Sequence, residues 1–129
     1  MGYTEQATGF SNFVVDENSL VRTQGRQIDW SGVTAGADGV KRLPAGKAMY
    51  ETGTGQLAVR DGANPAVGIL ETPADDASRS HAINGYGFLK GGSVYAELLP
   101  DAGDAAFATI QTELGPRFTF ETYADSRAA

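Results

Sequence analysis

The chain has 129 residues, a net charge of −6 and no cysteine, which fits one domain without disulfides, thiolate metal ligands or a cysteine nucleophile. Its ten lysines and arginines are scattered among sixteen acidic residues, whereas a nucleic-acid surface needs clustered positive charge, so no nucleic-acid partner is expected. No apolar run is long enough to span a membrane, and the first residues lack the pattern of a secretory signal.

Residues 1–39 are polar and weakly periodic, and their one dense apolar cluster contains Phe10, Phe13, Val14 and Val15. The small residues of 31–39 favour a flexible linker. We expect residues 1–39 to form an extended N-terminal arm, because they cannot bury enough apolar surface alone and such segments order against a partner. The alternative is a strand and a long loop that lie on the same domain as the rest of the chain.

Residues 40–129 are expected to form the folded body, because short apolar runs alternate there with glycine and Asp-Gly turns. Short strands at roughly ten-residue spacing are typical of a β-rich domain. We predict a polar loop at residues 73–80 and a hairpin across Gly91 and Gly92. The predicted strands are residues 47–50, 56–60, 66–72, 82–90 and 93–98.

One helix is predicted, because apolar residues between Ala106 and Leu114 recur at helical spacing. The Gly-Pro pair directly after Leu114 ends it. Asp101 and Asp104 are interpreted as acids that favour the N-terminal end of the helix dipole. Residues 117–123 alternate cleanly and predict a final, half-buried strand. The residues expected to fill the core are Val67, Ile69, Leu70, Phe107, Ile110, Phe118 and Phe120.

The sequence contains no recognisable catalytic, metal-binding or cofactor-binding set. His81 is the only histidine, and sequence identifies no positioned neighbour for it. The acidic pairs at 16–17 and 75–76 lack the spacing of a calcium loop. Neither G-x-G segment continues into a dinucleotide fingerprint. We therefore expect no enzyme activity, no cofactor and no metal.

Several segments between residues 43 and 121 follow one another in a characteristic order. An Asp-Gly turn at 61–62 precedes a Val-Gly-Ile-Leu strand at 67–70, an acidic loop lies at 75–76, and a Leu-Pro-acid sequence at 99–101 precedes the helix. As a set, these segments resemble the head decoration proteins of the lambda type, which cement bacteriophage capsids. The N-terminal arm departs from the usual Pro- and Thr-rich arm of that family.

The resemblance implies a β-dominated α+β fold, with a compact, small β-barrel or β-tulip-like body, one short helix and an extended N-terminal arm. It implies a homotrimer that binds the major capsid protein at three-fold positions of the assembled head and stabilises the lattice. The protein would be made in the host cytoplasm and act on the outer surface of the virion. The expected capsid-binding residues are Phe10, Phe13, Val14 and Val15, which would add a strand to a sheet edge of the capsid protein.

A second function from another class stays open at this point. The chain is also compatible with a small carbohydrate- or peptide-binding β module of a virion surface or tail protein, in which Trp30 and tyrosine side chains stack on a sugar ring. A β-rich hydrolase is a third interpretation, and it would have to use His81.

Overall fold

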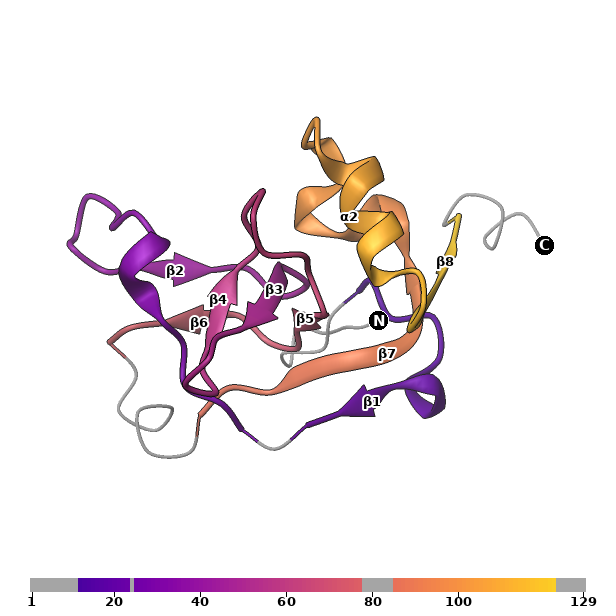
Figure 1. Cartoon of the computed structure of the whole chain (residues 1–129), viewed down its shortest axis with the longest axis horizontal. Helices are drawn as coiled ribbons and strands as arrows, with labels where there is room; N and C mark the ends of the chain where they lie inside the picture. The colour runs from indigo at the N-terminus through magenta and orange to yellow at the C-terminus, as the bar shows by residue number, and fades with distance from the viewer. Residues whose placement is uncertain (1–11, 24, 78–84, 123–129) are drawn as a thin grey trace, which may run out of the picture.

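The computed structural model describes residues 12–23, 25–77 and 85–122, arranged as Figure 1 shows. Most of their regular structure is β-strand, with one short α-helix, so the expected β-dominated class is confirmed. The strands are β1 (Val21–Arg22), β2 (Arg42–Leu43), β3 (Ala48–Glu51), β4 (Leu57–Val59), β5 (Gly68–Leu70), β6 (Ala74–Asp75), β7 (Phe88–Tyr95) and β8 (Phe118–Glu121). The helical segments are α2 (Phe107–Leu114) and the 3-10 turns η1 (Glu17–Ser19), η2 (Trp30–Gly32), η3 (Ala96–Leu98) and η4 (Pro100–Gly103).

Six strands form one sheet in the order β1-β7-β5-β3-β4, with β8 also paired to β7. Every pair in this sheet is antiparallel except that between β7 and β8. Strands β2 and β6 form a separate antiparallel ribbon at the left of Figure 1, and β6 lies within residues 73–80, where a polar loop was predicted. Among the described residues β1 and β4 do not pair with each other, so a closed barrel is not found.

Strand β7 is continuous, whereas the sequence predicted a hairpin across Gly91 and Gly92. That prediction is wrong, because the two glycines admit neighbouring segments rather than a turn. A Cβ at Gly91 would lie 3.1 Å from the carbonyl oxygen of Arg117, and one at Gly92 would lie 2.8 Å from Leu20 Cδ2. Gly92 also has a φ of +140°, which other residues rarely adopt. Glycine within a strand marks a close approach here.

Strands β7 and β8 are parallel neighbours, and residues 96–117 connect them through η3, η4 and α2. Parallel neighbours need a crossover of a dozen or more residues, usually a helix, because a tight turn can join only antiparallel strands. Residues 88–121 therefore form one strand–helix–strand unit. The sequence predicted the helix and the final strand but not their parallel pairing.

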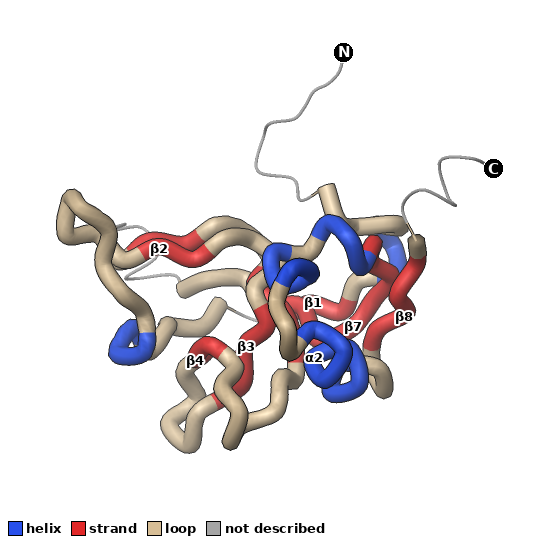
Figure 2. The backbone as a smooth tube through the Cα atoms, turned by 90° about the horizontal axis from the view of Figure 1, so that it is seen from above, coloured by secondary structure: helices blue, strands red, loops and turns tan. Residues whose placement is uncertain are grey.

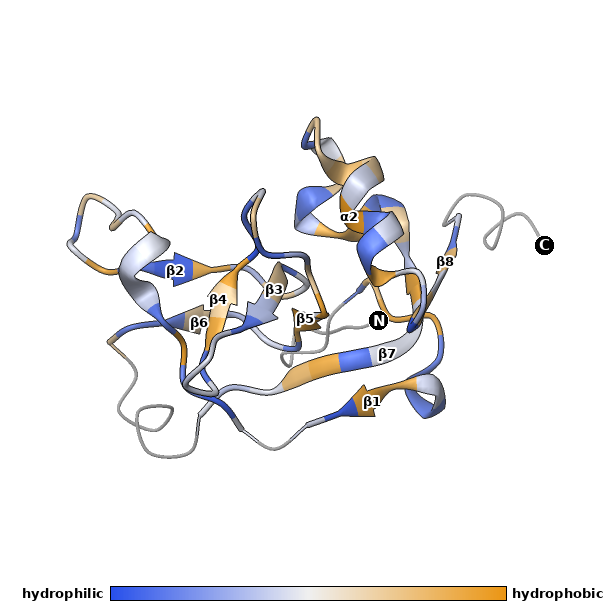
Figure 3. Ribbon diagram, in the orientation of Figure 1, coloured by the Kyte–Doolittle hydropathy of each residue, from blue (hydrophilic) through white to orange (hydrophobic). Residues whose placement is uncertain are grey.

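The main sheet separates two hydrophobic clusters, because successive side chains of a strand point to opposite faces. Residues paired across β3, β5 and β7 share a face, and the first cluster includes Ala48, Ile69 and Leu89. The second cluster includes the residue next to each of these in its strand, namely Met49, Leu70 and Phe88. The central strands therefore have apolar residues on both faces. Figure 3 shows hydrophobic residues along β5 and at the start of β7.

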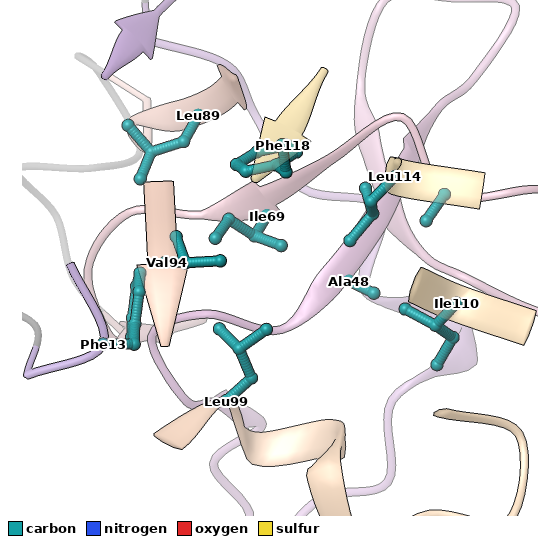
Figure 4. Close-up of a cluster of buried hydrophobic side chains, with 10 residues drawn as sticks. Phe13, Ala48, Ile69, Leu89, Val94, Leu99, Ile110, Leu114 and Phe118 are labelled. Carbon is teal, nitrogen blue, oxygen red and sulfur yellow. The ribbon is translucent and has the colours of Figure 1, made fainter. Parts of the chain in front are cut away.

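Both ends of the described chain contribute to the first cluster (Figure 4). Phe13 enters it from the N-terminal side, while Ile110, Leu114 and Phe118 enter it from α2 and β8. The predicted core is thus largely confirmed. Ile69, Leu70, Ile110 and Phe118 are buried, and Val67, Phe107 and Phe120 are half-buried at its margin.

Residues 12–39 belong to this body, so the expected boundary at residue 40 is wrong for the described part of the chain. Strand β1 pairs with β7, Ile28 is buried in the second cluster, and the N–H of Leu57 donates to the carbonyl of Gln27 at 2.8 Å. The apolar residues that anchor this segment are too widely spaced to give a periodic signal in the sequence. The alternative of a strand and a loop on the same domain describes residues 12–39 correctly.

Candidate interaction surface

Residues 13–15, which we call the strap, lie along the last part of β7. The N–H of Tyr95 donates to the carbonyl of Phe13 at 2.7 Å, and the N–H of Val15 donates to the carbonyl of Ser93 at 3.0 Å. The strap therefore acts as a short antiparallel strand on the edge of β7. Its partner in the structure is this protein's own sheet.

Phe13 anchors the strap in the core, where only 1 % of its surface is exposed. Gly46, with a φ of +87°, leaves room for the ring, since a Cβ there would lie 2.9 Å from Phe13 Cε2. Val14 forms an antiparallel bridge with Val94 and is half-buried. Three of the four expected capsid-binding residues are thus engaged within the chain, which corrects the expectation of a free arm for them. Phe10 lies outside the described residues.

The two ends of the described chain meet at one end of the sheet. Tyr95 is bonded to the strap on one side and is paired with Glu121 of β8 on the other. In Figure 2 the start of the described chain and the end of β8 accordingly lie on the same side of the molecule. We call the strap, residues 93–95 and β8 the Tyr95 end, and it is the candidate interaction surface.

Half-buried apolar side chains border the Tyr95 end. Val14 and Phe120 both neighbour Val94, one from the strap and one from β8. Both pack against the first cluster, and Leu98 of η3 does the same. These side chains extend the core toward the surface at the place where the chain ends meet, which is typical of the apolar part of a protein interface.

Most lysine and arginine side chains in the described part of the protein bind groups of the same chain. Six of its eight lysines and arginines form ion pairs with carboxylates. Lys41 and Arg117 instead donate to the carbonyl oxygens of Trp30 and Val67. The described residues therefore offer little unpaired positive charge, and their surface is poorly suited to bind phosphate groups.

Two ion-pair groups join elements that are far apart in the sequence. Arg60, after β4, binds both carboxylate oxygens of Glu113 in α2 at 3.0 and 2.9 Å. This hydrogen bonding lowers the pKa of Glu113. Glu51 of β3 binds Lys90 of β7 at 3.0 Å and also Arg26, and the hydrogen bond from Lys90 is the main cause of its lowered pKa. These groups hold the sheet and the helix together.

Asp101 connects η4 to β3. It is buried, its Oδ1 accepts a hydrogen bond from Lys47 Nζ at 2.7 Å, and its Oδ2 accepts the N–H of Ala48 at 3.0 Å. Its interpretation as an acid at the helix N-terminus is wrong, because α2 begins only at Phe107. Asp104 fits that role better, since it accepts the N–H of Ala106 at 2.7 Å.

The described residues contain no group of three or more potential metal-ligating side chains. Their acidic pairs have local structural roles: Asp16 caps η1, and Asp75 and Asp76 accept backbone N–H groups of Ala77 and Lys41. His81, the only histidine, lies outside the described residues. No helix in the described residues combines the length and apolar character needed to cross a membrane.

Trp30, which the sequence suggested as a platform for a sugar ring, packs against another aromatic side chain. Its ring centroid lies 6.2 Å from that of Tyr86 in an edge-to-face arrangement, and it packs against the second cluster. Burial raises the pKa of Tyr86. Much of the indole surface is therefore used for packing.

No model of a known protein family matches the chain, and a search of curated proteins finds no similar sequence. Function is therefore inferred from the residues and from their arrangement.

Proposed function

We propose that the protein is a bacteriophage head decoration, or cement, protein of the lambda type. It binds the major capsid protein as a homotrimer at three-fold positions of the assembled lattice, on the outer surface of the virion, and it stabilises the shell without catalysis. A ligand that binds only the assembled state stabilises that state by mass action. Three copies in one trimer make the binding multivalent, so weak single contacts suffice.

The segments that carry the resemblance have structural roles in the body. The Asp-Gly turn at 61–62 is shaped by Asp61, whose Oδ1 accepts the N–H groups of Ala63 and Asn64 at 2.9 and 2.8 Å. The Val-Gly-Ile-Leu segment supplies β5, which lies between β3 and β7. The Leu-Pro-acid segment supplies η4 with its buried Asp101. Support for the proposal comes from the whole ordered set, since no single segment is diagnostic.

The observation that carries the proposal is that the two ends of the described chain meet at the Tyr95 end. The strap and β8 both lie beside Val94 at this end, with the half-buried Val14 and Phe120 next to it. Contacts made by the strap and by β8 are therefore additive on one partner surface. Because the strap already pairs with β7, we place the capsid contact on the whole Tyr95 end rather than on residues 13–15 alone.

We propose further that the body is of the small β-tulip type. A small tulip-like body of the decoration-protein type agrees with an open sheet in which β7 is the common partner of β1, β5 and β8. Among the described strands, β1 and β8 each pair only with β7, so their other sides can face neighbours in the trimer or in the shell.

The test uses assembled head shells from a phage in which this gene is disrupted. Adding the purified protein is expected to restore density at the three-fold positions and to raise the temperature at which the shells open. Thr119→Trp, on the exposed position of β8, is expected to abolish decoration, whereas Thr34→Trp, on an exposed loop before β2, is expected to decorate like the parent. If the parent protein is folded but does not bind to the shells, the proposal is contradicted.

A specific feature favours the second candidate function, a small carbohydrate- or peptide-binding β module. A cavity of about 250 Å³ lies beside β4 and is lined by polar and aromatic side chains that include Tyr50. If the protein binds to a glycan array and does not bind to the shells, this function is favoured over capsid decoration.

A further inference from the structure

Strand β4 is the last strand of the main sheet, and the backbone of Val59 faces its open edge. Hydrogen-bonded residue pairs alternate along an antiparallel ladder. The N–H of Arg60 donates to the carbonyl of Ala48 at 3.0 Å, and the N–H of Thr52 donates to that of Gln56 at 2.8 Å. Val59 stands at the alternate position, so its N–H and C=O point away from β3.

The same edge of β4 already pairs with another segment at Leu57, two residues before Val59. Leu57 also faces outward, and its N–H donates to the carbonyl of Gln27 while its own carbonyl accepts the N–H of Asp29, both at 2.8 Å. The chain then turns into η2, and no described residue hydrogen-bonds to the outward N–H or C=O of Val59. An unpaired donor and acceptor on a sheet edge are the groups that an incoming extended strand binds.

A cavity of about 250 Å³ lies at this edge, so there is room for an occupant. Asp29 and Ser31 line it from the side of η2, Asp61 lines it from the loop after β4, and Tyr50 lines it from β3. The hydroxyl of Tyr50 makes no hydrogen bond with the described residues. The cavity thus combines an aromatic ring, two carboxylates and the free backbone groups of Val59.

Both carboxylates are fixed in place by their own turns. Asp29 Oδ1 accepts the hydroxyl of Ser31 at 2.7 Å and its N–H at 3.0 Å, and these hydrogen bonds lower the pKa of Asp29. The backbone N–H of Asn64 is the main cause of the lowered pKa of Asp61. Both groups are therefore ionised at neutral pH, in positions that need no rearrangement to meet a cation.

The cations nearest to this cavity are already bound to other groups. Arg60 lines the cavity, but Glu113 binds its guanidinium through two hydrogen bonds. The ammonium of Lys41 donates to the carbonyl of Trp30 at 3.0 Å. The charge that the cavity offers to a ligand is therefore negative.

We propose that the β4 edge binds an extended segment of a partner protein that carries a basic side chain. Its backbone pairs with Val59 and so continues the ladder that Gln27 and Asp29 begin on Leu57. Its arginine or lysine enters the cavity, where charge-assisted hydrogen bonds to Asp29 and Asp61 fix the register. A neutral sugar would leave the two carboxylates without a counter-charge.

This site goes beyond capsid decoration and does not depend on it. Strand β4 is the far end of the sheet path from β1, and it lies away from β8 and the Tyr95 end in Figures 1 and 2. A molecule bound to a shell through the Tyr95 end would thus retain an open β4 edge.

The test is a titration of isotope-labelled protein with a blocked pentapeptide, Thr-Val-Arg-Val-Thr, followed by amide chemical shifts in NMR. Saturable shifts are expected at Asp29, Val59 and Asp61, and the same peptide with glutamine at its centre is expected to bind at least about tenfold more weakly. Equal affinity for the two peptides, or no saturable shift at these amides, overturns the proposal.

Variants test the two kinds of contact separately. Asp29→Asn combined with Asp61→Asn keeps the turns, since asparagine caps as well as aspartate, and is expected to lose the preference for arginine. The matched control is Asp16→Asn, because Asp16 caps η1 as Asp29 caps η2, and it should bind like the parent.

A peptide with N-methylated backbone amides is expected to lose binding to the parent protein, since it cannot donate to the carbonyl of Val59. This measurement needs no protein variant, so it holds even if the double variant unfolds. Undiminished binding of the methylated peptide overturns strand pairing. Shifts of the same amides with simple monosaccharides, and none with the arginine peptide, would assign the cavity to a sugar and overturn the proposal.

Discussion

Lys47 and Asp101 are 54 positions apart in the sequence, and their ion pair holds η4 against β3. The carboxylate is almost fully buried, and its second oxygen accepts the N–H of Ala48. A buried backbone donor that lacks its acceptor destabilises a fold, so this carboxylate is worth more to the structure than an exposed ion pair.

Asp101→Ala is expected to lower the free energy of unfolding by about 1–3 kcal/mol, because it leaves the N–H of Ala48 and the ammonium of Lys47 without their acceptor. Urea denaturation followed by circular dichroism measures the loss. Asp104→Ala is the matched control, since Asp104 is exposed and accepts only a local N–H. Equal losses in the two variants would show that Asp101 does not connect η4 to β3.

Gly68→Ala is expected to destabilise the protein by about 1–3 kcal/mol or more, because its Cβ would lie 2.4 Å from the carbonyl oxygen of Leu89 and 2.5 Å from the ring of Phe88. The glycine of the Val-Gly-Ile-Leu segment is thus required for the close pairing of β5 with β7. A Cβ at Gly62 would have no neighbouring atom within 4 Å. The free energy of unfolding of Gly62→Ala should therefore lie within about 0.5 kcal/mol of that of the parent. A stable Gly68→Ala protein would contradict the register of these two strands.

Phe13→Ala is expected to lower the free energy of unfolding by about 3–5 kcal/mol, as for other fully buried phenylalanines, although the sequence suggested that Phe13 belongs to an arm outside the folded body. Thermal unfolding of the variant and of Val21→Ala provides the comparison. Val21 is also apolar and near the N-terminal end, but 55 % of it is exposed, so its truncation should change stability little. If Phe13→Ala unfolds at the same temperature as the parent, the strap does not belong to the core.

Acidification is expected to weaken the link between Arg60 and Glu113. The hydrogen bonds from Arg60 lower the pKa of Glu113 in the folded state below its ordinary value of 4.5, so the unfolded chain takes up the proton first. The contribution to stability is therefore complete above about pH 4.5 and is lost as the pH falls through the folded-state pKa.

Urea midpoints measured between about pH 7 and about pH 3 test this sign. Glu113→Gln cannot ionise, so its midpoint should fall less steeply with acid than that of the parent. Parallel curves for the two proteins would show that the pair contributes nothing to the pH dependence.

The elements that the sequence predicted well are those specified by neighbouring residues. The turn with Gly55 joins β3 and β4 as expected, and the end of α2 falls where the Gly-Pro pair begins. The continuity of β7 was missed, because Gly91 and Gly92 look like a turn unless the segments that approach them are known. Phe13 to Val15 were recognised as a segment that adds to a sheet edge, but sequence does not reveal which edge it finds. The open backbone of Val59 depends on where a distant segment leaves β4, so no local pattern marks it.

The strap has a consequence for the protein during its synthesis. The ribosome produces Phe13 long before Val94 and Tyr95, the residues that it lies beside in the finished fold. At about 5–20 residues per second, the nascent chain carries this apolar segment unpaired for on the order of several seconds. During that interval it is open to chaperones or to the sheet edge of another chain. Crowded ribosomes would therefore favour exchange of straps between newly made copies.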